Sequence, residues 1–252
     1  MSSASTASLA DLRKQIEGID RVHARTRKVL AFDVPEIDAK LPGGGLALGA
    51  LHEITGGANG AVDGAVPAAF AAGIAARTGG KVLWAYTQPD LFAPALAQSG
   101  LNADQVVFFE AMDEPTLLTG FETVLRHGAL SAVVAELGGL SHLASKRLQL
   151  AAETSGTLAL AIRRWKRPVD ARAFGNETAA FTRWRVTEIN SIPLPVRGVG
   201  RARWHLELMR CRGGKCADFD IEACDAKGFV ALSAEMADGS TETGAWGQRA
   251  VS

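Results

Sequence analysis

The chain has 252 residues, 47% of them hydrophobic, and its 27 Lys and Arg residues balance 27 Asp and Glu residues to a formal net charge of zero. This hydrophobic content is enough for a substantial core and predicts a soluble globular protein. The sequence has no run of about eighteen apolar residues, and its first residues, MSSASTASLADLRKQ, lack a hydrophobic signal region, so we expect a cytoplasmic protein with no membrane contact.

The neutral total hides a division of charge along the chain. Residues 51–162 carry five Lys and Arg against ten Asp and Glu, residues 163–215 carry thirteen against four, and residues 216–252 carry two against seven. A basic segment between two acidic ones predicts a surface that faces a polyanion.

The first predicted element is an amphipathic helix from about Leu9 to Ala24, which would form a helical arm over residues 1–30. Its apolar stripe consists of Leu9, Leu12, Ile16 and Ile19. Such a stripe can dock on the core of its own chain or on another protein, and the sequence leaves both alternatives open.

From residue 51, short apolar runs alternate with helical periodicity, which predicts an α/β fold with a mostly parallel sheet and crossover helices. The expected strands are Leu51 to Thr55, Lys81 to Tyr86, Gln105 to Phe109, Ala132 to Glu136 and Thr157 to Arg163. The expected helices between them cover residues 65–77, 90–98, 115–127 and 141–154.

Beyond residue 180 apolar and polar residues alternate, which is typical of strands. The expected strands are FTRWRVTEI, ARWHLELMRC, ADFDIEA and FVAL, with a Gly-Gly turn at 213–214. This pattern predicts an antiparallel extension of the sheet at its carboxyl-terminal end. We place a single core domain at residues 31–234 and expect the small, polar residues 235–252 to form a disordered tail.

The stretch LHEITGGANGAVDGAV, residues 51–66, is a strand, a glycine-rich turn and a helix start, which is where a phosphate-binding loop would lie. Its turn positions are Gly56, Gly57, Gly60, Asp63 and Gly64. A working loop, G-x-x-x-x-G-K-[ST], supplies a lysine for the phosphates and a hydroxyl for magnesium. Counted from Gly56, the lysine and hydroxyl positions fall on Val62 and Asp63, and no other register supplies either residue.

Asp63 is worse than a neutral replacement, because its carboxylate would lie beside a bound phosphate. Two like charges about 4 Å apart near a protein surface repel by about 4 kcal/mol. A helix amino terminus attracts an anion by only about 1 kcal/mol. The turn therefore indicates a nucleotide-binding scaffold without its chemistry. The plainer alternative is a flexible surface loop after a buried strand.

Metal binding is not expected. Cys211, Cys216 and Cys224 have four and seven residues between them, which matches neither a disulfide framework nor a C-x-x-C zinc pattern. We expect buried free thiols. His205 is the only nearby imidazole, and it alternates with apolar residues in an expected strand.

Taken in order, these elements resemble the core of RecA-type recombinases, and the whole chain resembles the ImuA family of RecA-like accessory proteins of damage-inducible mutagenesis. The resemblance covers most of residues 30–232. It rests on VPEIDAKLPGGGLALGALHEITG, LSAVVAELGGL, AFGNETAA and LMRCRGGKCADFDI, whose order and spacing carry it.

The resemblance implies that the protein is not an enzyme. The magnesium-binding aspartate of recombinases falls on Glu136, and the acid that activates water falls near Thr87 and Gln88. The glutamine that senses the γ-phosphate falls near Arg163. Phosphoryl transfer needs its positioning and electrostatic groups together, so we expect no ATP or magnesium cofactor. Glu136 is equally a structural carboxylate, and we do not assign it as a metal ligand.

Residues 163–185, RRWKRPVDARAFGNETAAFTRWR, fall where recombinases contact single-stranded DNA. Cations that neutralise phosphates and aromatic rings that stack on bases are the two requirements of sequence-tolerant binding. The predicted DNA-contacting residues are Arg163, Arg164, Trp165, Lys166, Arg167, Arg172, Phe174, Arg183 and Arg185. The alternatives are a solvated loop whose aromatic side chains pack into the core and a loop that binds an acidic protein surface.

The family resemblance also implies partners. They are the Y-family polymerase-like protein ImuB, a C-family error-prone polymerase, the RecA recombinase and single-stranded DNA, in SOS-induced translesion synthesis. The stripe of the helical arm would bind another RecA-like subunit, so a homo-oligomer is also expected. Two other functions stay open, a DNA-stimulated ATPase with a divergent loop and a protein-only regulator of recombinase filaments or cell division.

Overall fold

The computed structural model describes residues 27–57, 64–164, 174–193, 197–198 and 200–233. The predicted helix of the arm and the predicted tail both lie outside this part of the chain. Among the described residues, no helix is long and apolar enough to cross a membrane.

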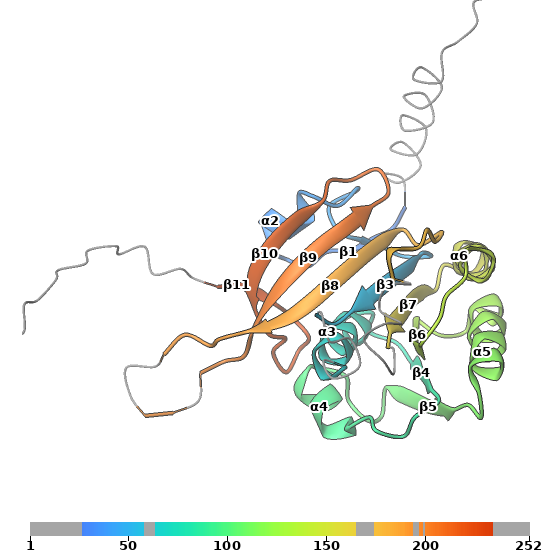
Figure 1. The fold of residues 1–252 in the computed structure, drawn as a ribbon, viewed down its shortest axis with the longest axis horizontal. Helices are drawn as coiled ribbons and strands as arrows, with labels where there is room; N and C mark the ends of the chain where they lie inside the picture. Colours follow the sequence, from blue (N-terminus) through green and yellow to red (C-terminus); the bar gives the residue numbers. More distant parts are fainter. Residues whose placement is uncertain (1–26, 58–63, 165–173, 194–196, 199, 234–252) are drawn as a thin grey trace, which may run out of the picture.

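Within the described residues, nine strands form one sheet in the order β11-β10-β9-β8-β3-β7-β6-β4-β5 (Figure 1). The six strands from β8 to β5 pair in parallel, and β8, β9, β10 and β11 pair in antiparallel fashion. The strands are β3 Leu51–Thr55, β4 Val82–Tyr86, β5 Val106–Glu110, β6 Ala132–Leu137, β7 Leu158–Arg163, β8 Thr182–Ile189, β9 Arg203–Cys211, β10 Ala217–Glu222 and β11 Ala231–Leu232. This topology confirms the predicted parallel core with an antiparallel extension.

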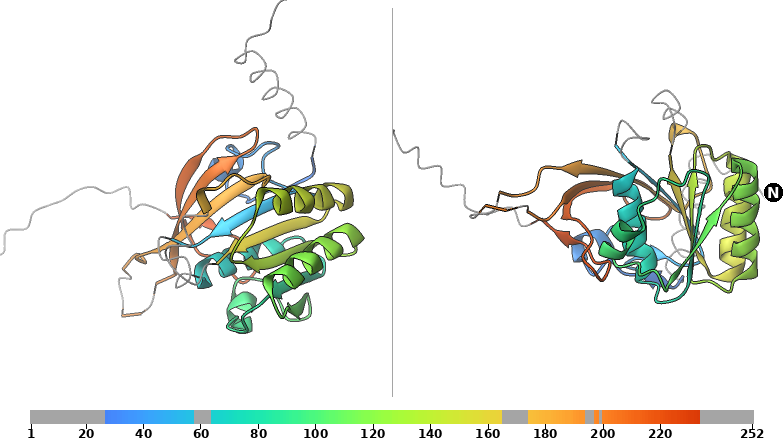
Figure 2. Two further views of the ribbon diagram at one scale, coloured as in Figure 1. Left: turned by 45° about the vertical axis from the view of Figure 1, so that its right-hand side comes forward. Right: turned by 90° about the horizontal axis from the view of Figure 1, so that it is seen from below.

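Helices cover both faces of the parallel part of the sheet (Figure 2). They are α3 Ala65–Ala76, α4 Ala93–Gln98, α5 Glu114–His127 and α6 His142–Ser155. Helices α3 and α4 pack on one face and contribute to the larger hydrophobic cluster, whereas α5 and α6 pack on the other face. Strands β6 and β7 are buried along their whole length and are largely apolar, as expected for central parallel strands. Strand β3 is equally buried but carries the polar residues His52, Glu53 and Thr55.

The ends of α5 and α6 follow from local sequence. Asp113 accepts a hydrogen bond from the Thr116 backbone N–H at 2.8 Å, and the Ser141 hydroxyl accepts one from the Ala144 N–H at 3.1 Å. Both helices end at a left-handed glycine, Gly128 and Gly156.

The segment before β3 contains structure that the sequence pattern did not predict. Strands β1 Val29–Leu30 and β2 Leu46–Ala47 pair with each other, and a short helix, α2, covers Pro35–Asp38. Phe32 closes one side of the core, because its ring stacks on Phe70 with centroids 6.1 Å apart. This segment therefore belongs to the core.

The expectation of three buried thiols is wrong for Cys216, and Cys211 and Cys224 are only partly buried. Cys216 is exposed, and its thiol donates to the Met209 carbonyl at 3.2 Å. Burial raises the pKa of Cys211 and of Cys224 to about 12, so both thiols stay protonated and unreactive at neutral pH. Among the described residues no group of His, Cys, Asp and Glu could hold a metal ion.

Candidate functional site

The site corresponding to a nucleotide pocket lies where the carboxyl ends of β4, β6 and β7 meet the amino end of α3. Ligands of open α/β sheets bind at this edge. Gly56 and Gly57 follow β3, and Gly64 is the residue before α3. Gly60 and Asp63 lie outside the described residues. A cavity of 260 Å³ opens beside Gly64, between α3 and α4.

An arginine fills the position against the amino end of α3. Arg164 follows β7 directly, and its backbone N–H donates to the Leu137 carbonyl at 2.8 Å. A Cβ atom on Gly64 would lie 2.9 Å from Arg164 Nε, so the guanidinium is in contact with the start of the helix. A cation here opposes the helix dipole at a cost of about 0.3 to 1 kcal/mol.

Two carboxylates offset that cost. Arg164 Nη1 donates to Glu136 Oε2 at 2.5 Å, and its Nη1 and Nη2 donate to the two Asp90 oxygens at 2.9 and 2.7 Å. The paired hydrogen bonds to Asp90 raise the pKa of Arg164, and the bonds from Arg164 lower the pKa of Asp90. The other Glu136 oxygen accepts from Trp84 Nε1 at 2.8 Å. Both Glu136 oxygens are therefore already occupied. We call Asp90, Glu136 and Arg164 the Arg164 triad.

A second group of charges lies inside the sheet. Glu53 on β3 is fully buried, and its carboxylate accepts from Arg163 Nη1 at 3.0 Å, from Arg183 Nη2 at 3.4 Å and from the Thr178 hydroxyl. The Phe174 ring lies 4.9 Å from the Arg183 guanidinium. Burial lowers the pKa of Arg163, and the charge of Glu53 opposes that shift. These contacts join β3, β7 and β8.

This buried group corrects part of the predicted DNA surface. Arg163 is 1% exposed, Arg183 8% and Phe174 4%, which leaves no surface for a phosphate or a base. The guanidinium groups of Arg163 and Arg183 are used to compensate a buried carboxylate, which is costly to leave unpaired. Arg185 is half-buried and lies 3.3 Å from Glu207.

The remaining predicted residues are distributed as follows. Trp165, Lys166, Arg167 and Arg172 lie outside the described residues, and so do the arm residues Leu9, Leu12, Ile16 and Ile19. Sequence reasoning missed Asp90 and Glu53. Asp90 carried a usable signal, because it is the first acid after β4 and lies two residues beyond Gln88.

The fold and this site together define a RecA-like protein in which an internal ion triad lies at the nucleotide position. Comparison with solved structures supports the class, since the crystal structure of the RadB recombinase matches with a TM-score of 0.52 over 80% of this chain and 98% of that chain, at 15% identity. No model of a protein family matches the chain. Two curated relatives named Protein ImuA, from two strains of Caulobacter vibrioides, are each 39% identical over 208 residues, which is 79% of this chain and 84% of theirs. The chain belongs to the ImuA family.

Proposed function

We propose that the protein is a non-catalytic, RecA-like accessory factor in SOS-induced, error-prone translesion DNA synthesis. In this role it would bring together single-stranded DNA, the recombinase and the polymerase partners ImuB and a C-family error-prone polymerase. Membership of the ImuA family supports the process. The single observation that supports a role without catalysis is the Arg164 triad at the nucleotide position.

The triad argues against phosphoryl transfer on physical grounds. Catalysis of that reaction depends on a lysine, a metal-binding hydroxyl and a positioned base. Here the guanidinium of Arg164 is bound to two carboxylates, and a phosphate would have to compete with both. The rival reading, a DNA-stimulated ATPase, requires the triad to open before nucleotide can bind.

A test in cells addresses the proposed role in mutagenesis separately from the question of catalysis. A strain without this gene should lose damage-induced mutations while keeping normal growth on undamaged DNA. An Arg164→Lys variant, which keeps the positive charge but not the forked pairing, should restore mutagenesis in that strain. Unchanged mutagenesis in the deletion strain would refute the proposed process.

A second candidate, a protein-only regulator of recombinase filaments, is favoured by one observation. Arg163, Arg183 and Phe174 are buried, which removes three residues from the predicted DNA surface. Purified full-length protein separates the two candidates. Measurable affinity for a single-stranded oligonucleotide supports the first, whereas a recombinase complex with no DNA affinity supports the second.

A further inference from the structure

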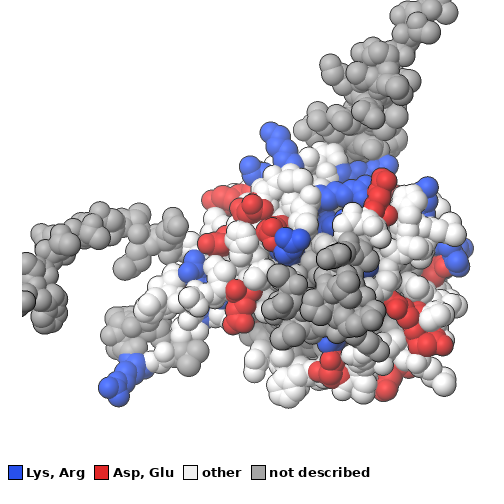
Figure 3. Space-filling view, in the orientation of Figure 1, with Lys and Arg blue, Asp and Glu red and all other residues white. Residues whose placement is uncertain are grey.

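Helix α6 exposes two large apolar side chains on its outer face. Leu143 is 70% exposed and Leu150 is 62% exposed. They are seven residues apart, so they lie on the same side of the helix, about 10.5 Å from each other along its axis. Figure 3 shows acidic and basic side chains together at the right of the molecule, where Figure 1 places α5 and α6. The two leucines therefore form a small apolar site within a charged surface.

Arg27 fixes the place where the preceding segment reaches the core. Its guanidinium donates to the Gly49 carbonyl at 2.8 Å, pairs with Glu153 in the last turn of α6, and lies 5.6 Å from the centre of the Phe181 ring. Residues 1–26 therefore join the described structure beside the carboxyl end of α6.

The apolar stripe of the predicted arm has the spacing of the exposed leucines. Leu12 and Ile19 are seven residues apart, as Leu143 and Leu150 are. A helical arm that runs parallel to α6 can therefore place Ile19 against Leu150 and Leu12 against Leu143 in a single register. Apolar residues repeated at this interval on both partners are the usual basis of helix pairing.

The chain is long enough to reach this position. A helix from Ile19 to Ala24 rises about 7.5 Å. The three steps from there to Arg27 span up to about 10 Å, which is about the distance between the axes of two packed helices. Leu150 lies three residues before Glu153, or about 4.5 Å along α6. Ile19 therefore falls within one helical turn of Leu150 while Glu153 holds Arg27.

Charge favours the same register. Lys146 is exposed between the two leucines of α6, and Asp20 follows Ile19 directly. In two parallel helices packed through these positions, Lys146 and Asp20 flank the contact on the same side. Arg147, on the other flank, is already paired with Glu122 at 2.5 Å. The register therefore joins opposite charges on one flank and leaves Arg147 with its present partner.

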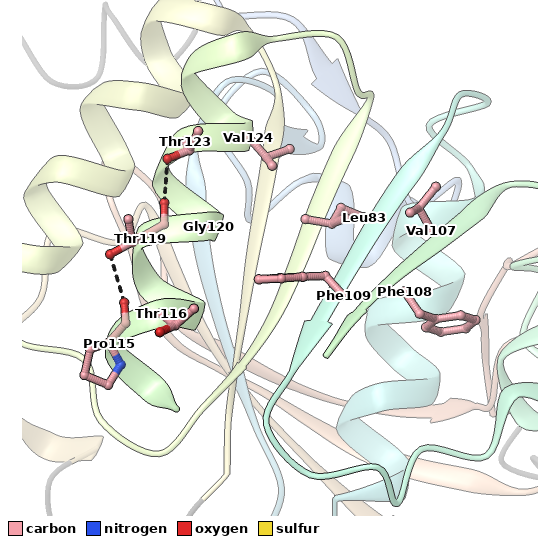
Figure 4. A pocket seen from close by; sticks show the side chains of 10 residues that line it. All are labelled: Leu83, Val107, Phe108, Phe109, Pro115, Thr116, Thr119, Gly120, Thr123 and Val124. Carbon is pink, nitrogen blue, oxygen red and sulfur yellow. Dashed lines mark hydrogen bonds between the residues drawn. The ribbon is translucent and has the colours of Figure 1, made fainter. Parts of the chain in front are cut away.

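The apolar groove of 650 Å³ between β5 and α5 is a poorer position for the arm (Figure 4). Helix α6 packs on β3 and β7, whereas α5 packs on β4 and β6, so α5 separates α6 from the groove. Reaching the groove from Arg27 means crossing two helices, or about 20 Å. The three residues that follow the predicted helix are too few to cover that distance.

We propose that the arm docks on α6 of its own chain, with Ile19 against Leu150 and Leu12 against Leu143. The contact covers the stripe that is predicted to bind another RecA-like subunit, so the two contacts exclude each other. A partner subunit has to displace the arm from α6 before it can bind the stripe. The contact within the chain is independent of that partner, of DNA binding and of nucleotide chemistry.

The first test measures how fast a maleimide labels Leu150→Cys in the full-length protein. Cys216, the exposed native thiol, is replaced by serine in every variant. We expect labelling at least about tenfold faster when Ile16→Asp and Ile19→Asp add charge to the stripe. The matched control is Met112→Cys, 97% exposed between β5 and α5, whose rate should change by less than about twofold. Equal rates for Leu150→Cys with either arm would overturn the proposal.

A disulfide tests the register and distinguishes the arm's own chain from a second copy. Ile19→Cys with Leu150→Cys should close on oxidation, since a disulfide needs Cβ atoms within about 4.5 Å. Leu12→Cys with Leu150→Cys, displaced by two helical turns, should stay reduced. Mixing a chain that carries only Ile19→Cys with one that carries only Leu150→Cys should give no covalent dimer. Such a dimer would assign the contact to a second copy and overturn the proposal, as would failure of the first pair to close.

Discussion

At the scale of single residues, Arg164 shows how a phosphate position can be filled from within the chain. The cation lies against the amino end of α3, where the dipole disfavours it, and Asp90 and Glu136 compensate. Gly64 allows this contact, because any side chain there would meet the guanidinium. The ion pairs of the triad therefore stabilise the folded state.

Replacing Arg164 with alanine should lower the free energy of unfolding by about 2 kcal/mol, because Glu136 is nearly buried and would lose a charged hydrogen bond. The matched control is Arg185→Ala, whose partner Glu207 is more exposed, and it should cost less than about 1 kcal/mol. Urea denaturation of the two variants measures both values. Equal losses would show that the triad contributes no more than a surface ion pair.

The lowered pKa of Asp90 predicts a dependence of stability on pH. A carboxyl whose pKa is lower in the folded state stabilises the protein above its unfolded pKa, near 4, and loses this effect as pH falls through the folded pKa. The difference in unfolding free energy between wild type and Asp90→Asn should be constant above pH about 5 and shrink below about pH 4. Asp90 is half exposed, so the difference should be under about 1 kcal/mol. A difference that grows in acid would contradict the pairing.

At the scale of elements, the five parallel strands predicted from residue 51 onward match the structure to within about a residue at each end, because short apolar runs between helical segments mark them in the sequence. Contacts between distant residues were not predictable in this way. Glu53 pairs with Arg163 and Arg183, which are 110 and 130 residues further along the chain. Nothing local in RRWKR distinguishes a buried arginine from an exposed one, so the predicted DNA surface included side chains that belong to the core.

The structure also sharpens the test of the arm. Arg27 donates to the Gly49 carbonyl at 2.8 Å and pairs with Glu153, so residues from 27 onward support the core. Deleting residues 1–26 should leave the melting temperature nearly unchanged and abolish association with another RecA-like subunit, measured by analytical ultracentrifugation. Insolubility of the truncated chain would instead assign the arm to the core.

For DNA binding, the burial of Arg163 and Arg183 and the ion pairs of Arg164 and Arg185 leave three basic residues in the segment, Lys166, Arg167 and Arg172. If all three contact phosphates, log affinity should fall against log salt with a slope of about −2, since each contact releases about 0.7 counterion. Anisotropy of a labelled oligonucleotide measures it. Lys166→Ala with Arg167→Ala should flatten the slope, whereas Trp165→Ala should weaken binding at an unchanged slope. Unchanged affinity in both variants would show that this segment does not bind DNA.

At the scale of the whole molecule, the fold is RecA-like, and the order of elements along the sequence was sufficient to predict this class. The triad could not be predicted, because Asp90, Glu136 and Arg164 come together only when three parallel strands end at one edge. We infer a RecA-like fold whose nucleotide position is occupied by side chains of the same chain.

Steady-state ATP turnover by the full-length protein, with and without single-stranded DNA, tests this inference most directly. We expect turnover at background in both conditions. Turnover should stay at background in Val62→Lys with Asp63→Ser, because restoring the lysine and hydroxyl leaves Arg164 in place and the base position without a free acid. Turnover that single-stranded DNA stimulates in the wild type, and that Glu136→Ala abolishes, would contradict the account.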